Sequence, residues 1–145
     1  MKRQLSRNDL IRLMVEQLGR HRPRWLPVKT TVLVIRRLIS RAFPAESGCI
    51  FFDGAMNGSG YTKLNIRLHG RHVQVYAHRL VCQLAHNGDD IPHWMEAAHE
   101  KCDCPPCIHP EHLELQRRRY NRERSMRNTH RKVAERRAAE QRAAA

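Results

Sequence analysis

The sequence predicts an α+β protein in which a small domain with a β-hairpin lies between two basic, helical extensions. Three features predict this fold: apolar residues at helical spacing near the start, two alternating segments in the middle, and an arginine-rich end with high helix propensity. We place the N-terminal extension at 1–46, the domain at 47–125, and a helical or disordered tail at 126–145. At 145 residues, the chain can bury one modest core.

Two amphipathic helices are expected in the N-terminal extension. The first is expected from about Arg7 to Leu18, with Ser6 as its N-cap and Gly19 as its stop. The second is expected over 30–41, although the β-branched residues of TTVLVI leave a strand as the alternative. The apolar face of the first helix comprises Leu10, Ile11, Met14, Val15 and Leu18.

The alternation in residues 61–68 and 71–77 predicts a β-hairpin, with its turn at His69 and Gly70. A short strand, CIFF, is expected to precede it, beginning at Cys49. The inward side chains are expected to be Leu64, Ile66, Leu68, Val73, Val75 and Ala77, and the outward ones on the first strand Lys63, Asn65 and Arg67.

Helices are also expected on both sides of a segment rich in cysteine and histidine. The one before it is expected to end at Gly88, with Cys82 facing the core. The one after it is expected over 113–128, and the tail beyond about Val133 has helix propensity but no apolar stripe.

Charge is unevenly distributed along the chain. The net charge is +13, with +9 in residues 1–42, −4 in residues 43–116 and +8 in residues 117–145. Basic arms of this kind are typical of proteins that bind nucleic-acid phosphates, although a solvated charge excess gives the same count. The chain opens with no apolar signal and has no membrane-spanning run, so we expect a protein that is not secreted, has no membrane partner and lies in the cytoplasm or the compartment that holds DNA.

The segment HEKCDCPPCIHPEHL, residues 99–113, predicts a metal site. In a reducing compartment, clustered cysteines more often bind metal than form disulfides, and free thiols are the alternative. Cys102, Cys107 and His112 are spaced to wrap one tetrahedral zinc ion. The fourth ligand is either the local Cys104 or the remote Cys49, which would staple the base of the hairpin to the loop.

Several motifs together resemble a known family. C-I-F-F-D-G, G-S-G-Y, Y-A-H-R-L-V, A-H-E-K-C-D-C-P-P-C-I-H-P-E-H-L and Asn121 occur in this order. They resemble the zinc-stapled HNH, or His-Me finger, endonucleases of phages and mobile introns, and above all the His-Cys box homing type. The resemblance covers about residues 47–125 and implies a zinc-stapled ββα-metal nuclease core.

The resemblance implies a role for each matching residue. His99 matches the catalytic histidine, and Asn121 matches the helix residue that holds the catalytic metal. Arg67 or Arg71 corresponds to the arginine that steadies the scissile phosphate, and His78 matches a recurrent histidine. The implied zinc ligands are Cys49, Cys102, Cys107 and His112.

The sequence departs from the family's pattern at four positions. Lys101 is an extra residue, and Ala98 stands where many relatives have the Asp before the catalytic histidine. Asn121 would therefore be the one protein ligand of the divalent cation, as in the His-Cys box type. Cys104 and His109 each stand where the family commonly has Asn, so we consider both as extra metal ligands or loop-bracing residues.

The chemistry of phosphodiester hydrolysis suits these residues. A neutral His99 can take a proton from water if a backbone carbonyl holds its other ring nitrogen. Mg²⁺, for which Mn²⁺ can substitute, suits the amide oxygen of Asn121, phosphate oxygens and water. The alternatives are a His99 that binds zinc or packs in the core, and an Asn121 that is merely solvated.

The sequence therefore predicts a metal-dependent DNA endonuclease of phage or mobile-element origin that acts on double-stranded DNA. A non-catalytic zinc-stapled nucleic-acid-binding protein is the alternative, a scaffold protein explains less, and magnesium-dependent plasmid nicking discriminates among them. A homodimer, the target sequence and the number of strands cut stay open. The expected DNA-contacting residues are Lys63, Asn65, Arg71, Arg117, Arg118, Arg119, Arg122 and Arg124.

Overall fold

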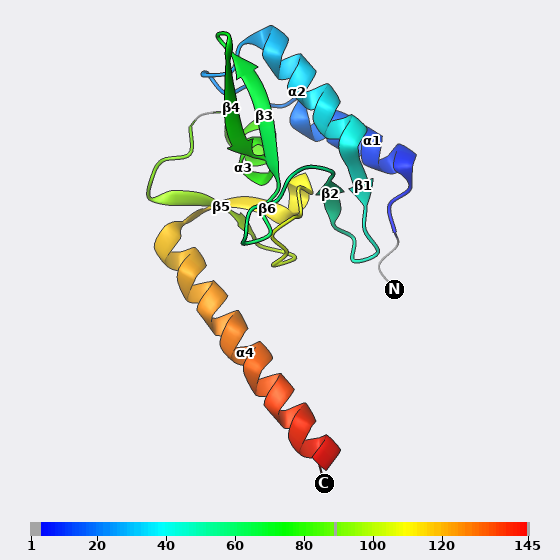
Figure 1. The fold of residues 1–145 in the computed structure, drawn as a ribbon, viewed down its shortest axis with the longest axis vertical. Coiled ribbons are helices and arrows are strands. Elements are labelled where there is room, and N and C mark those ends of the chain that lie inside the picture. The colour runs from blue at the N-terminus through cyan, green and yellow to red at the C-terminus, as the bar shows by residue number, and fades with distance from the viewer. Residues whose placement is uncertain (1–3, 89, 145) are drawn as a thin grey trace.

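The structure, a computed structural model, describes residues 4–88 and 90–144. It is a mixed α and β architecture compatible with the predicted α+β class, with three two-stranded antiparallel sheets among the described residues (Figure 1). None of the helices in these ranges is long and apolar enough to cross a membrane. The elements are α1 (Arg7–Leu18), α2 (Val28–Arg41), β1 (Ala42–Pro44), β2 (Ile50–Phe52), β3 (Lys63–Leu68), β4 (Arg71–Tyr76), α3 (Ala77–Cys82), β5 (Met95–His99), β6 (Leu113–Arg117) and α4 (Arg118–Ala144).

The N-terminal extension folds into the two helices that the sequence predicts. The Ser6 hydroxyl accepts a hydrogen bond from the Asp9 amide at 3.1 Å, which caps α1. Val15 was placed on the apolar face, but this placement is wrong because its side chain is 56% exposed. The buried stripe advances every three or four residues, and Val15 points about 100° away from it. Residues 28–41 form a helix, which excludes the strand alternative.

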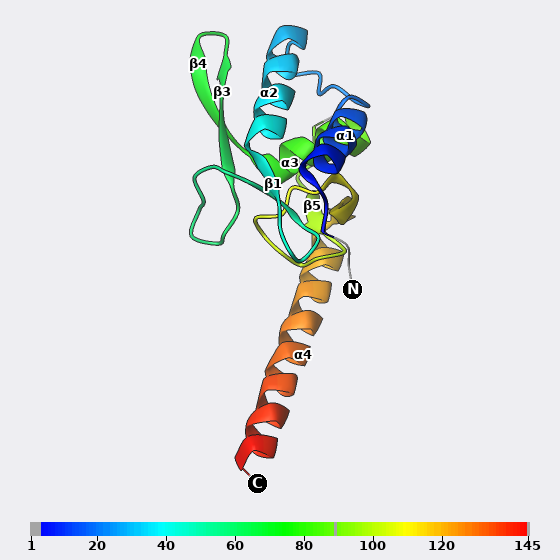
Figure 2. The same ribbon diagram turned by 90° about the vertical axis from the view of Figure 1, so that its right-hand side faces the viewer.

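The N-terminal helices and the central domain share one hydrophobic core. Figures 1 and 2 show α1 and α2 lying together on one side of the molecule, with α2 next to the β3–β4 hairpin. The cysteine- and histidine-rich segment 99–113 also contributes to this core, through Ile108. The core includes Leu10, Met14, Leu18, Leu26, Leu38, Ile50, Phe52, Leu64, Ile66, Leu80, Val81, Leu84, Ile108 and Leu113.

The predicted hairpin is confirmed, but its two strands are not equally buried. Leu64 and Ile66 on β3 are buried, whereas Val73, which pairs with Ile66, is 36% exposed. The inward placement of Val73 is therefore wrong. The asymmetry follows from α2, which packs beside β3 and donates from the Arg37 guanidinium to the Asn65 carbonyl at 2.8 Å.

The helix after the hairpin ends as predicted. Gly88 caps it with a φ of +73°, a left-handed conformation that glycine adopts without steric cost. Its last turn, Gln83–Asn87, is π-helical, which the sequence did not indicate. Cys82 is fully buried, as predicted.

The helix predicted over 113–128 is wrong in its first five residues. Leu113–Arg117 form β6, which pairs antiparallel with β5 so that Leu113 lies opposite His99. The helix α4 begins only at Arg118 and runs for 27 residues, none of them buried within its described part. Both views show α4 projecting away from the rest of the molecule (Figures 1 and 2).

Candidate metal centre and active site

Four predicted ligands converge in the structure. The three cysteine sulfurs and one ring nitrogen of the cluster all lie within 4.8 Å of one another. The Cys107 sulfur, for example, is 3.5 Å from His112 Nδ1. Three sulfurs and an imidazole nitrogen suit zinc, so this cluster can hold a metal ion of that kind. Its members are Cys49, Cys102, Cys107 and His112.

Backbone pairing brings the remote cysteine to the loop. The loop crosses β2, where Cys107 forms a bridge with Phe51 and the Ile108 amide donates to the Ile50 carbonyl at 2.7 Å. Cys49 immediately precedes Ile50, so this pairing places its side chain beside the loop. Asp103 turns the chain at the start of the loop with a φ of +48°. The cluster therefore ties two segments that lie over fifty residues apart.

The cluster's thiols strongly influence one another. A hydrogen bond from the Cys107 thiol lowers the pKa of Cys102 to about 5. That hydrogen bond, together with burial, raises the pKa of Cys107. The amide of His109 donates to the Cys107 sulfur at 3.4 Å, a contact that favours a thiolate. Because zinc binds thiolates, metal binding here would release protons.

Cys104 and His109 lie beside the cluster and outside the converging set of four. Burial and the neighbouring Cys49 thiol raise the pKa of Cys104 to about 11. His109 Nδ1 accepts from the Glu111 amide at 3.2 Å and so caps the short 3-10 helix Pro110–His112. Burial lowers the pKa of His109 to about 4, which keeps the ring neutral and able to accept that hydrogen bond. The structure thus gives His109 a loop-bracing contact.

His99 lies at the end of β5 and is 6% exposed. Its Nε2 atom is 2.9 Å from the Cys107 carbonyl oxygen. A carbonyl only accepts, so Nε2 carries the proton and Nδ1 keeps a lone pair. Burial lowers the pKa of His99, which favours the neutral ring. His99 is not among the four converging ligands, and its tautomer is the one that general-base chemistry requires.

Asn121 lies in the first turn of α4 and lines the same small hollow, of about 70 Å³, as His99. Two partners hold its side-chain amide. Its Nδ2 donates to the Glu96 carboxylate, and its Oδ1 accepts from the Arg124 guanidinium at 3.2 Å. The structure therefore brings together the two residues predicted to carry the chemistry and fixes the rotamer of one of them.

A wider hollow of about 250 Å³ adjoins the smaller one at His99, because Tyr61, Ala97 and Asn121 line both. We name it the Glu96 hollow. Glu96 and Arg79 line it, and the sequence analysis assigned neither to the site. Arg79 falls within the Y-A-H-R-L-V motif, which was a usable signal, whereas nothing in the sequence marked Glu96. The other lining residues are Asn57, Ser59, Tyr76 and His78.

His78 packs against both Tyr61 and His99, whose rings also lie 5.9 Å apart. Its ring stacks on Tyr61 with centroids 4.8 Å apart, and the His99 ring lies at 5.2 Å. The residue is 7% exposed, and its Nδ1 atom has no hydrogen-bond partner among the described residues. Burial lowers the pKa of His78 to about 3, so its ring is neutral. Buried ring nitrogens are usually hydrogen-bonded, so the unpartnered Nδ1 of His78 is an uncommon feature of this hollow.

The predicted arginines lie in different settings. Arg67 pairs with His72 near the tip of the hairpin, and neither Arg67 nor Arg71 lines a hollow that His99 or Asn121 lines. Arg124 has a side chain only 16% exposed, which donates to the carbonyls of His99 and Glu100. It thus braces the site from within the protein. Exposed residues among the other predicted DNA contacts are Asn65, Arg117, Arg118, Arg119 and Arg122, and Lys63 is half-buried.

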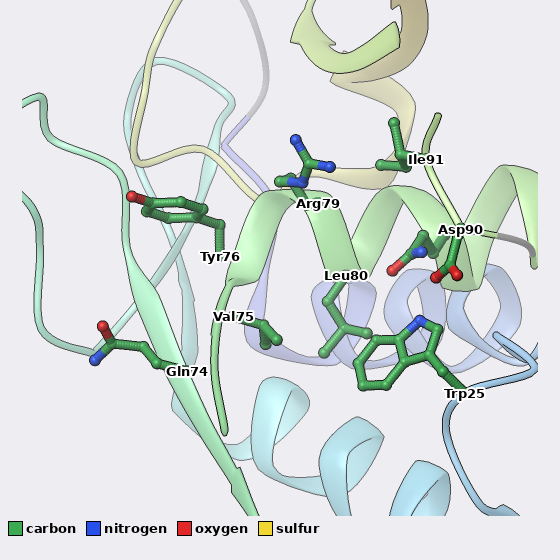
Figure 3. Close-up of a pocket in the computed structure, with 9 residues that line it drawn as sticks. Trp25, Gln74, Val75, Tyr76, Arg79, Leu80, Asp90 and Ile91 are labelled. Carbon is green, nitrogen blue, oxygen red and sulfur yellow. The ribbon is translucent and has the colours of Figure 1, made fainter. Parts of the chain in front are cut away.

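Another hollow, of about 450 Å³, adjoins the Glu96 hollow because both have Tyr76 and Arg79 in their walls. Figure 3 shows Val75 and Leu80 between the rings of Tyr76 and Trp25. Arg79 therefore stands between the two hollows. No hydrogen bond or ion pair holds its guanidinium among the residues that the structure describes, so it is available to an anion.

No protein-family model, curated protein or solved structure matches this chain. A functional assignment therefore rests on the residues of the site itself.

Proposed function

We propose that the protein is a metal-dependent DNA endonuclease of the HNH, or His-Me finger, type. The observation that carries this proposal is the hydrogen bond from His99 Nε2 to the Cys107 carbonyl, in a hollow that Asn121 also lines. This arrangement leaves a neutral imidazole nitrogen beside a fixed amide group. A histidine that served packing alone would not need to share a hollow with a polar amide side chain.

His99 acts as the general base in this proposal. Its Nδ1 lone pair accepts a proton from the attacking water, while the Cys107 carbonyl holds the ring and stabilises the charge that develops on it. Burial favours the neutral ring, as a base requires. A positioned base of this kind contributes roughly 10²–10⁴ in rate.

Asn121 is proposed to bind the divalent cation through its amide oxygen. Glu96 accepts from Nδ2, and Oδ1, which accepts one hydrogen bond from Arg124, keeps a second lone pair that suits Mg²⁺ or Mn²⁺. When bound, such a cation supplies charge stabilisation for the phosphate and the leaving oxygen. Arg79, which lines the Glu96 hollow, is proposed to contact the phosphate, a role predicted from the sequence for Arg67 or Arg71.

The cluster of Cys49, Cys102, Cys107 and His112 is proposed to hold a structural zinc ion. Four protein ligands complete a tetrahedron and leave no position for substrate. The ion would fix the loop whose Cys107 carbonyl orients His99. The basic residues of α4 are proposed to bind the phosphates of double-stranded DNA.

Zinc-loaded protein should relax supercoiled plasmid in the presence of Mg²⁺ and not when Mg²⁺ is omitted. Binding of the same plasmid fragment is measured in parallel by electrophoretic mobility shift. If the folded protein binds duplex DNA but cleaves none with Mg²⁺ or Mn²⁺, the proposal fails and the non-catalytic binding protein replaces it.

A further inference from the structure

Glu96 is a carboxylate at the candidate active site whose chemistry the proposed function does not use. It lies on β5, three residues before His99, and its side chain is 27% exposed. One carboxylate oxygen accepts from Asn121 Nδ2, so the two side chains face the same space. Carboxylate and amide oxygens are the ligands that Mg²⁺ and Mn²⁺ prefer.

No close ion pair neutralises this carboxylate among the described residues. The Arg118 guanidinium approaches it only to 3.9 Å and is itself half exposed, which makes the pair weak. Glu100 offers a useful contrast, because Arg124 lies 3.2 Å from it with a side chain only 16% exposed. Glu96 therefore retains more of its negative charge for another cation than Glu100 does.

The wall of the Glu96 hollow gives a second, independent observation. His78 lines this hollow and is 7% exposed, yet its Nδ1 has no hydrogen-bond partner among the residues described. A buried polar atom without a partner costs free energy, which points to a polar species in the hollow. The water molecules that Mg²⁺ retains on binding are species of this kind.

We propose that Glu96 and Asn121 together bind the divalent cation, each through a side-chain oxygen. The inference rests on the proposed function for the role of Asn121. It departs from the family resemblance, which implies Asn121 as the one protein ligand. The additional charge allows the protein to hold the cation before DNA supplies phosphate oxygens, because carboxylate count raises the affinity of such sites.

A simpler role for Glu96 is to orient Asn121 by hydrogen bonding alone. Glutamine separates the two roles, since its amide oxygen still accepts from Asn121 Nδ2 but carries no charge. Glu114 provides the matched control, because it is an exposed carboxylate on the neighbouring strand β6 that lines neither the Glu96 hollow nor the smaller one at His99.

The experiment is a Mn²⁺ titration of zinc-loaded protein without DNA, followed by electron paramagnetic resonance of free Mn²⁺. The wild type and Glu114→Gln should bind one Mn²⁺ equally, and Glu96→Gln should bind it roughly tenfold or more weakly. Wild-type affinity in Glu96→Gln, or no stoichiometric Mn²⁺ site in the wild type, would overturn the inference.

A second measurement needs no variant and covers the case in which Glu96→Gln does not fold. Substoichiometric Mn²⁺ should broaden the nuclear magnetic resonance signals of Glu96 and Asn121 first and leave those of Ala143, near the far end of α4 and about 33 Å along the helix from Asn121, sharp. Broadening that begins elsewhere would contradict the site. Mn²⁺ binding that depends on Glu96, without any DNA cleavage, would refute the proposed nuclease and keep the cation site. DNA cleavage by the wild type, with unchanged Mn²⁺ binding in Glu96→Gln, would keep the nuclease and refute the role of Glu96.

Discussion

Two groups of potential metal ligands lie side by side in this protein and differ in nearly every physical respect. The cysteine cluster has soft sulfur ligands that touch one another, two of them buried. The Glu96 hollow has hard oxygen ligands and remains open to solvent. A closed set of soft ligands suits a structural ion, and an open set of oxygens suits a cation that must also meet substrate.

Cys107 links the two groups. Its sulfur belongs to the cluster, while its carbonyl oxygen accepts from His99 Nε2. Cys107 therefore connects the cluster to His99, the residue proposed as the general base. Loss of a cluster ligand should therefore disturb the position of His99, whereas substitution of His99 should leave metal binding by the cluster intact.

The largest effect should come from breaking the cluster. Cys49→Ser should lose zinc and unfold the domain, because structural zinc in small domains contributes about 10–16 kcal/mol of apparent binding free energy. Cys104→Ser should keep both, since Cys104 lies outside the converging four. Mass spectrometry measures the zinc content of the two variants, and thermal unfolding measures their stability. Full zinc in Cys49→Ser with loss in Cys104→Ser would reverse the ligand assignment.

Removing the proposed amide ligand of the divalent cation should slow cleavage without disturbing the cysteine cluster. Asn121→Ala should slow cleavage by roughly 10²-fold, since metal-ion stabilisation supplies several kcal/mol. High Mg²⁺ should restore part of the activity if the defect is in cation affinity. Rates of plasmid cleavage across a Mg²⁺ series give the answer, and a loss of zinc from this variant would show that the two groups are not separable.

A smaller effect is expected from the basic arm, whose outer part meets the cysteine-rich loop through the ion pair of Lys132 with Asp103 at 3.6 Å. Deleting residues 126–145 should weaken duplex binding and flatten its salt dependence by about 0.9 for each DNA phosphate that the arm neutralises. Ion pairs within α4, such as Arg136 with Glu140 at 2.9 Å, already engage some of the arginines. Fluorescence anisotropy at several salt concentrations measures the slope, and an unchanged slope would make the arm a solubilising appendage.

The smallest effect should come from His109, which braces the loop between the two groups. His109→Ala removes the acceptor for the Glu111 amide and should cost about 1 kcal/mol, as the loss of a helix cap does. Zinc content and cleavage should persist. Chemical denaturation followed by fluorescence provides the free energy, and a variant without zinc would instead make His109 a ligand.

Local patterns predicted much of this fold because they act over a few residues. The Ser6 cap, the hairpin turn and the Gly88 stop all depend on neighbouring backbone geometry. The sequence left Cys49 and Cys104 as alternatives for the fourth ligand, because spacing alone does not place a residue over fifty positions away, and the family resemblance implied Cys49.

Long-range pairing explains what the sequence did not predict. Leu113–Arg117 has a helix-compatible composition, but antiparallel pairing with β5 makes it a strand. That pairing, and the start of α4 just after it, bring Asn121 to Glu96 across 25 positions of sequence. Arg124 was predicted to contact DNA as one of several arginines crowded on this helix, and only the tertiary structure shows that it supports the backbone of His99.

The most direct test of this division of labour is to measure zinc content and magnesium-dependent cleavage on one preparation of His99→Ala. The variant should hold one zinc per chain, fold and bind DNA as the wild type does, while cleavage falls by roughly 10²–10⁴. Loss of zinc from His99→Ala would contradict the account, because the histidine would then be a structural ligand and not the base.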